Sequence, residues 1–144
     1  MITLYQLEYT DEMIEYLNGP GGGWSNAIKK YELIEADQNM RLGAERWENR
    51  FWKHYKAVAE IKAEDLDDGW IIGNNDHHEM VKEGSLKPLL PYIASKRTGR
   101  AKTYMMVNMH SMSVGNICKM NEEYFICNRT GWKKVKIETE HAKN

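Results

Sequence analysis

Near the end of the chain, three short apolar runs alternate with turn-forming residues. The runs cover residues 117–120, 124–128 and 132–137. Gly115 lies in a Ser-Val-Gly-Asn sequence that suits a tight turn or a bulge, because glycine adopts a positive φ without steric cost. Residues 128–131 end in glycine and suit a hairpin loop. The pattern therefore predicts a C-terminal β-meander.

The first residues alternate between apolar and polar positions. Residues 2–9 are predicted to form a strand, since they are also rich in β-branched and aromatic side chains. Thr10 then supplies a helix cap, and the two acidic residues after it suit the positive end of a helix dipole. The glycine-rich residues 18–23 end this helix. They lack the Lys-Ser/Thr pair of a phosphate-binding loop, so we interpret them as a flexible loop.

The next apolar positions predict a second strand and a second helix. Residues 31–36 are read as the strand. Trp47, Phe51 and Tyr55 recur every four residues, as they do on one face of a helix. This spacing predicts a helix that starts after Gly43 and presents an aromatic stripe.

Two structures are compatible with residues 55–62. In one, the aromatic helix continues through this segment as a single long element. In the other it ends at Tyr55, and a strand over residues 56–61 leads into a short acid-capped helix over residues 63–72. Periodicity alone does not decide between the two.

The remaining pattern completes the expected fold. Residues 83–101 look irregular and are the best candidate for a mobile insertion, and a strand pattern resumes at residues 103–107. A chain of 144 residues is expected to form one domain, residues 1–144. We expect an α+β fold: a mainly antiparallel sheet with helices packed on one face, completed by the C-terminal β-meander.

Composition and charge exclude several classes of protein. The chain is 42% hydrophobic and 28% charged, as ordinary globular proteins are. Its 20 basic and 21 acidic residues give no overall reason to expect nucleic acid or an anionic membrane as the partner. No apolar run approaches the roughly 18 residues of a membrane span, and residues 1–5 do not resemble a secretion signal. We therefore expect a cytoplasmic protein, with Cys118 and Cys127 as reduced thiols.

Few residues are arranged for catalysis or metal binding. The sequence Asp-His-His-Glu at residues 76–79 contains good metal ligands, but neighbouring side chains on a regular element point apart. We interpret it as a hydrated polar turn and expect no metal and no cofactor. Cys118 with His110 could form a nucleophile and its base, but nothing supplies a third, orienting group. We therefore expect a protein that is not an enzyme.

Two surfaces are candidates for binding. Trp47 and Trp52 are five residues apart, so on a helix they point about 140° apart and one of them should reach a partner. The predicted protein-binding surface combines this helix with a neighbouring acidic segment, and its residues are Trp47, Trp52, Asp65, Asp67 and Asp68. The alternative is a nucleotide or nucleic-acid surface in which basic side chains bind phosphates and Trp or Tyr rings stack on bases. Its basic residues are Lys96, Arg97, Arg100 and Lys102.

The end of the chain resembles a known group of sequences. The run His-Ser-Met-Ser-Val-Gly-Asn-Ile at residues 110–117 is followed by Tyr124-Phe125 and by Gly-Trp-Lys-Lys-Val at residues 131–135. This order is similar to the ending of small uncharacterised phage and plasmid proteins, and YodL-like domains of mobile elements have a similar ending. Here Met112 replaces their leucine, and Asn116 replaces their aspartate.

The resemblance extends to the middle of the chain and implies an origin. Residues 55–74 resemble a part of such phage proteins in which a strand leads into a short helix and a Gly-Asn turn, which favours the strand over residues 56–61. The resemblance implies a mobile-element protein and supplies no catalytic residues.

The expected function follows from this origin. We expect a small phage or mobile-element accessory protein that binds and modulates a host macromolecule, a protein, in the host cytoplasm and without catalysis. The alternative is a nucleotide or nucleic-acid binding protein, and self-association into a homo-oligomer remains open.

Overall fold

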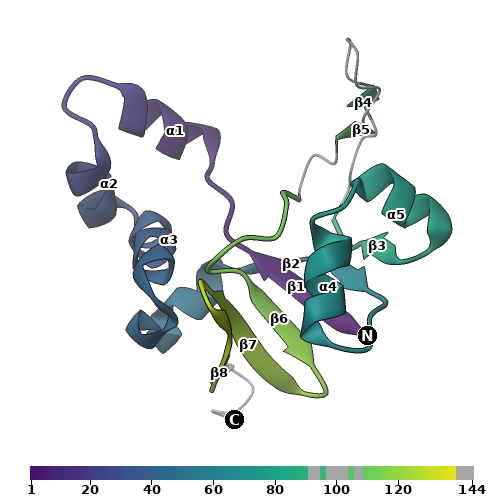
Figure 1. The fold of residues 1–144 in the computed structure, drawn as a ribbon. Helices are drawn as coiled ribbons and strands as arrows, with labels where there is room; N and C mark the ends of the chain where they lie inside the picture. Colours follow the sequence, from purple (N-terminus) through teal and green to yellow (C-terminus); the bar gives the residue numbers. More distant parts are fainter. Residues whose placement is uncertain (91–94, 97–103, 106–108, 139–144) are drawn as a thin grey trace.

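A six-stranded antiparallel sheet forms the centre of the protein (Figure 1). The computed structural model describes residues 1–90, 95–96, 104–105 and 109–138. The strand order is β3-β2-β1-β6-β7-β8, so the first strand of the chain lies beside the C-terminal meander. The strands are β1 Ile2–Gln6, β2 Lys56–Ile61, β3 Leu86–Pro88, β6 Ile117–Met120, β7 Glu123–Asn128 and β8 Gly131–Val135. The predicted α+β fold with its C-terminal meander is confirmed.

Within the described residues, five α-helices and two 3₁₀ segments connect these strands. They are α1 Asp11–Asn18, α2 Trp24–Lys30, α3 Glu32–Leu42, η1 Ala44–Arg46, η2 Asn49–His54, α4 Leu66–Gly73 and α5 His77–Glu83. Short β4 Ser95–Lys96 and β5 Tyr104–Met105 pair separately with each other. Across the described residues, no helix is long and apolar enough to cross a membrane.

Helices α1 and α4 begin at residues whose side chains cap them, whereas α2 and α3 have no side-chain cap. Thr10 accepts a hydrogen bond from the backbone N–H of Met13 at the start of α1. Asp65 accepts one from the N–H of Asp68, so α4 begins at Leu66, three residues later than the helix considered over residues 63–72. Each cap satisfies a backbone donor that the first helical turn cannot satisfy by itself.

Two hydrophobic clusters lie on the two faces of the sheet. Leu4 and Cys118 are paired across β1 and β6 and belong to the cluster that α4 and α5 complete. Tyr5 and Ile117, one residue along, are paired with each other and belong to the cluster of α3, η1 and η2. Since neighbouring residues of a strand point to opposite faces, helical segments cover both faces of the sheet rather than the single face expected (Figure 1).

Residues 31–36 form the start of α3 instead of the predicted strand. Leu33, Ala36 and Met40 have helical spacing and are buried together in one cluster. The sequence Tyr-Glu-Leu-Ile-Glu-Ala also allowed an alternating pattern, and the longer apolar periodicity that continues to Met40 decides the structure. The prediction of a strand here was wrong.

The predicted aromatic helix is replaced by η1 and η2. The backbone is extended at Trp47 and Glu48, between the two 3₁₀ segments. Residues 56–61 then form β2, which is the strand that the resemblance favoured, and α4 follows it.

The segment 83–101 contributes to the main sheet at its start. Leu86 and Pro88 pair with Ile61 and Ala59 of β2, and this pairing makes β3 an edge strand. Residues 91–94 and 97–101 of this candidate insertion lie outside the described residues.

Gly115 lies where the loop before β6 crosses α3. Its φ is +94°, and a Cβ built on it would lie 3.0 Å from the Cβ of Met40. The left-handed conformation costs about 1–2 kcal/mol for a residue with a side chain. Glycine is therefore required here both by the backbone and by the neighbouring helix.

Replacing this glycine should destabilise the protein. We expect Gly115→Ala to lower the free energy of unfolding by about 2–4 kcal/mol, from backbone strain and contact with Met40. Gly131→Ala is the matched control, because Gly131 has a φ of +100° and a Cβ at this position would have nothing within 4 Å. Urea unfolding of both variants measures the difference. Equal losses would show that the contact with Met40 contributes nothing.

Candidate functional site

A buried glutamine, Gln6, holds residues 110–117 against β1. Gln6 is 1% exposed, and its Nε2 donates hydrogen bonds to the carbonyl oxygen of His110 at 2.8 Å and to Oδ1 of Asn116 at 3.1 Å. Its Oε1 accepts a hydrogen bond from the N–H of His110 at 3.1 Å. One side chain thus holds both ends of this segment, and its amide group is satisfied within the protein.

Further hydrogen bonds fix the turn itself. Oδ1 of Asn116 also accepts a bond from the N–H of Ser113 at 2.9 Å. The hydroxyl of Tyr55 donates to the carbonyl oxygen of Gly115 at 2.6 Å, and burial raises the pKa of this tyrosine, so it remains a donor. Gly115 and Asn116 also exchange backbone hydrogen bonds with Cys127 of β7. Residues 110–117 therefore form a rigid turn before β6, which we call the corner.

This corner forms one wall of a cavity of about 390 Å³. The opposite wall comes from the chain after β1 and from α1, α2 and α3. The hydroxyl of Tyr9 donates to Oδ2 of Asp37 at 2.6 Å, and Arg41 contacts the same oxygen at 3.2 Å. The cavity is lined by Leu7, Glu8, Tyr9, Ile14, Trp24, Asp37, Arg41, His110, Ser113, Gly115 and Asn116. It is the first of two candidate sites.

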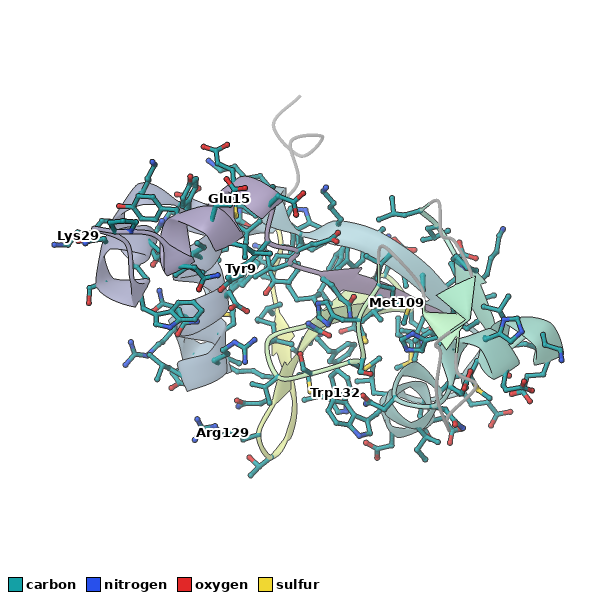
Figure 2. All side chains as sticks on the ribbon, turned by 90° about the horizontal axis from the view of Figure 1, so that it is seen from above. Tyr9, Glu15, Lys29, Met109, Arg129 and Trp132 are labelled. Atoms are coloured by element: carbon teal, nitrogen blue, oxygen red, sulfur yellow. The ribbon has the colours of Figure 1, made fainter. Side chains whose placement is uncertain are left out.

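The second candidate site is a hollow of about 470 Å³ between α4 and the β7–β8 hairpin. The rings of Trp70 and Trp132 meet edge to face there, with centroids 6.5 Å apart. Asp67 of α4 and Arg129 of the hairpin loop also line it. Figure 2 shows Trp132 beside α4, whereas Tyr9 of the first cavity lies among helices α1–α3.

The residues of the protein-binding surface predicted from the sequence lie on two opposite faces of the sheet. Trp47 and Trp52 are half-buried and pack against the cluster of α3 and η2. Trp52 lies 4.7 Å from Tyr5 and 5.2 Å from Tyr124, measured between ring centroids. The acidic residues Asp65, Asp67 and Asp68 lie at the start of α4, which packs against the opposite face of the sheet.

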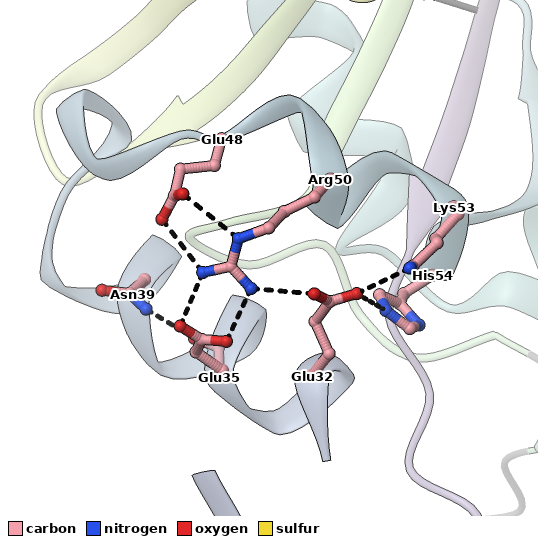
Figure 3. A network of polar contacts seen from close by, with 7 residues as sticks. All are labelled: Glu32, Glu35, Asn39, Glu48, Arg50, Lys53 and His54. Carbon is pink, nitrogen blue, oxygen red and sulfur yellow. Dashed lines mark hydrogen bonds and ion pairs between the residues drawn. The ribbon is translucent and has the colours of Figure 1, made fainter. Parts of the chain in front are cut away.

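A network of charged side chains holds the segment that contains Trp47 and Trp52 (Figure 3). Arg50 of η2 forms ion pairs with Glu32 and Glu35 of α3, at 2.9 and 2.7 Å. His54 and Lys53 contact the other oxygen of Glu32 at 2.8 and 3.0 Å. These contacts join η2 to α3 and explain the fixed position of the segment without a ligand.

The same network lowers the pKa values of its two glutamates on α3. Hydrogen bonds from His54, Arg50 and Lys53 lower the pKa of Glu32 to about 2. Arg50 likewise lowers the pKa of Glu35. Both carboxylates are therefore charged in the folded protein at neutral pH.

The residues considered from the sequence for metal binding or nucleophilic chemistry are not arranged for either in the described part of the structure. Asp76 caps α5 by accepting a hydrogen bond from the N–H of Glu79. The described part of the chain contains no group of three His, Cys, Asp or Glu residues that could hold a metal ion. Cys118 and Cys127 are free and buried, and burial raises the pKa of their thiols to about 12 and about 11. Both are thus thiols at neutral pH rather than reactive thiolates.

The predicted basic surface is largely beyond what the structure describes. Arg97, Arg100 and Lys102 lie outside the described residues, and Lys96 is placed only as part of β4.

Comparison with known proteins gives no relative. No protein-family model matches the chain, and no curated protein or solved structure matches it significantly.

Sequence reasoning missed the aromatic residues that line the two sites. Trp24 and Trp70 are exposed by 52% and 37%. One signal was available: Trp24 follows three glycines directly, which left it without neighbours to bury it. Trp70 precedes two isoleucines, and this context favoured a place in the core.

Removing the amide of Gln6 should loosen the corner. Gln6→Leu leaves the N–H and carbonyl of His110 without partners, so we expect a loss of about 3 kcal/mol or more in the free energy of unfolding. Tyr55→Phe removes a single hydrogen bond and should cost about 1 kcal/mol. Chemical denaturation compares the two, and a Gln6→Leu protein as stable as wild type would contradict the role of the amide.

The network around Glu32 predicts a pH dependence. The pKa of Glu32 is lowered on folding from 4.5 to about 2, so its stabilisation is complete above pH 4.5 and is lost as the pH falls towards 2. We expect the melting temperature of Glu32→Gln to fall less steeply than that of wild type over this range. Glu79→Gln, at an exposed carboxylate 4.0 Å from Lys82, serves as the control and should follow wild type. Parallel curves for all three proteins would rule out this contribution.

Proposed function

We propose that this chain is a small phage or mobile-element accessory protein that binds and modulates a host protein in the host cytoplasm, without catalysis. The similarity of residues 110–117 to the ending of such proteins supports the origin. The observation that carries the binding role is that exposed acidic side chains and exposed apolar side chains lie next to each other on α4. We call this region the α4 surface, and define it by Asp67, Asp68, Trp70, Ile71 and Trp132.

The way α4 packs explains why these side chains face outwards. Gly69 and Gly73, one helical turn apart, are buried against the sheet. A Cβ at Gly69 would lie 2.8 Å from Ile2, and a Cβ at Gly73 would lie 2.8 Å from Met112. Leu66 and Ile72 pack beside these glycines on the inner face of the helix. Ile71 lies on the opposite side and is 62% exposed, and Trp70 lies at the flank and is 37% exposed.

The chemistry of the α4 surface indicates the kind of partner. Asp67 and Asp68 are exposed in the first turn of α4, and Asp67 lines the hollow beside Trp70 and Trp132. Tryptophan is enriched among the residues that contribute most to protein interfaces, and carboxylates at a rim favour a partner of opposite charge. Arg129 also lines the hollow, and the two exposed carboxylates of α4 outnumber it. The surface therefore fits a protein segment that presents an apolar side chain beside Lys or Arg.

The α4 surface shares two residues with the binding surface expected from the sequence. Asp67 and Asp68 remain, whereas Asp65 caps α4. Trp70 and Trp132 replace Trp47 and Trp52, because Trp47 packs on Tyr55 and Trp52 packs on Tyr5, Tyr55 and Tyr124.

A charge placed on the α4 surface should weaken binding of the host protein. Ile71→Glu adds a carboxylate to an exposed apolar position, so we expect capture of the host protein to weaken by at least about tenfold. Leu42→Glu is the matched control, since Leu42 is 59% exposed on α3 and lies on the other side of the sheet. Quantitative affinity capture from host lysate, with mass spectrometry, measures both variants beside wild type.

Salt dependence provides an independent check on the same surface. Asp67→Asn with Asp68→Asn should weaken capture at low salt and have less effect at high salt, because exposed charges are screened. A partner captured equally by wild type and Ile71→Glu, or recovery of only a second copy of the chain, would contradict the proposal.

A further inference from the structure

The cavity beside residues 110–116 is separate from the α4 surface and has its own chemistry. Its residues come from the chain after β1, from α1, α2 and α3, and from the corner that Gln6 holds. Segments far apart in the sequence thus converge on one space of about 390 Å³, a size typical of small-molecule sites.

Trp24 is the main apolar side chain of this cavity. It is 52% exposed, although it begins α2 directly after the glycine-rich loop. Nδ2 of Asn26 donates to the carbonyl oxygens of Gly21 and Gly22 at 2.8 and 3.2 Å, which holds this loop against the helix. An exposed tryptophan in a held position offers a ring surface at little conformational cost.

Tyr9 supplies a second ring, next to Trp24. The two ring centroids are 6.3 Å apart, and the ring planes are inclined by 64°. The hydroxyl of Tyr9 is hydrogen-bonded to Asp37, and burial together with this carboxylate raises its pKa, so the side chain stays neutral. Two inclined aromatic rings with electron-rich faces are a common feature of sites that bind ammonium groups.

The charges of the cavity have a net negative sign. Asp37 and Arg41 form an ion pair at 3.2 Å and largely compensate each other. Glu8 also lines the cavity and is exposed. None of the described residues forms an ion pair with it. One carboxylate is therefore in excess, which favours a cation and disfavours a phosphate or another anion.

We propose that this cavity binds a small organic cation, in which an ammonium group contacts Trp24, Tyr9 and Glu8 and an apolar body contacts Ile14. Lysine-like alkylammonium and quaternary ammonium compounds have this chemistry. The site is independent of the α4 surface, so either proposal can fail without the other.

Choline and 3,3-dimethylbutan-1-ol have the same shape, but only choline is positively charged. Comparing the two therefore tests whether binding requires the positive charge of the ligand. Isothermal titration calorimetry of the full chain should detect binding of choline or butylammonium and none of the neutral alcohol. Titration up to about 10 mM detects even millimolar affinity. No heat from either cation, equal binding of the neutral alcohol, or preferential binding of adenosine monophosphate would overturn the proposal.

Variants assign the binding to this cavity. Trp24→Leu should weaken cation binding by about 2- to 30-fold, and Glu8→Gln should weaken it by about two- to fivefold. Arg41→Gln should strengthen it by a similar factor, because a neighbouring positive charge is removed. These side chains are exposed, and circular dichroism verifies that the variants are folded.

Trp70→Leu in the other hollow is the control and should bind the cation as wild type does. Loss of binding in Trp70→Leu but not in Trp24→Leu would place the cation beside Asp67 and overturn the proposal. Weaker binding of the cation in Arg41→Gln would show that the positive charge of this arginine does not oppose the ligand, and it would overturn the proposal as well.

Discussion

The buried amide of Gln6 is the interaction on which much of this structure depends. It joins the first strand to both ends of the segment that precedes β6, and these parts are more than 100 residues apart in sequence. A buried amide is costly unless all its bonds are made, so it favours a single arrangement of the corner. Met40 and Tyr55 then contact Gly115, and the position of α3 relative to the meander follows from these contacts.

The two faces of the sheet are stabilised by different means. On one face, glycines let α4 approach Ile2 and Met112 closely, and the helix is held by packing. On the other face, aromatic rings fill the space between η2 and the sheet, and Arg50 with its carboxylates joins η2 to α3. This difference explains the unequal use of tryptophan: Trp47 and Trp52 stabilise the fold, whereas Trp24 and Trp70 remain open to solvent.

Local rules predicted the parts of the fold whose signals are local. The meander has short apolar runs separated by turn residues, and α4 begins at the capping carboxylate of Asp65. Residues 31–36 fit two periods equally well, and only burial of Met40 against the sheet shows which one applies. Of the aromatic stripe, Phe51 lies in the 3₁₀ segment η2, whereas Trp47 and Tyr55 lie just after η1 and η2. Spacing alone does not reveal these breaks in the helix. The candidate sites depended on which aromatic residues stay exposed, and long-range packing decides that.

The edges of the sheet have a consequence for the behaviour of the protein at high concentration. β3 is three residues long and ends in Pro88, which has no N–H to donate to a further strand. At the other edge, β8 carries the exposed Lys133 and Lys134, and Lys134 is paired with Glu123 of β7. Approach of a second β8 would bring like charges together. Growth of the sheet from one molecule into the next is thereby opposed at both ends, and the chain is protected from fibrous aggregation.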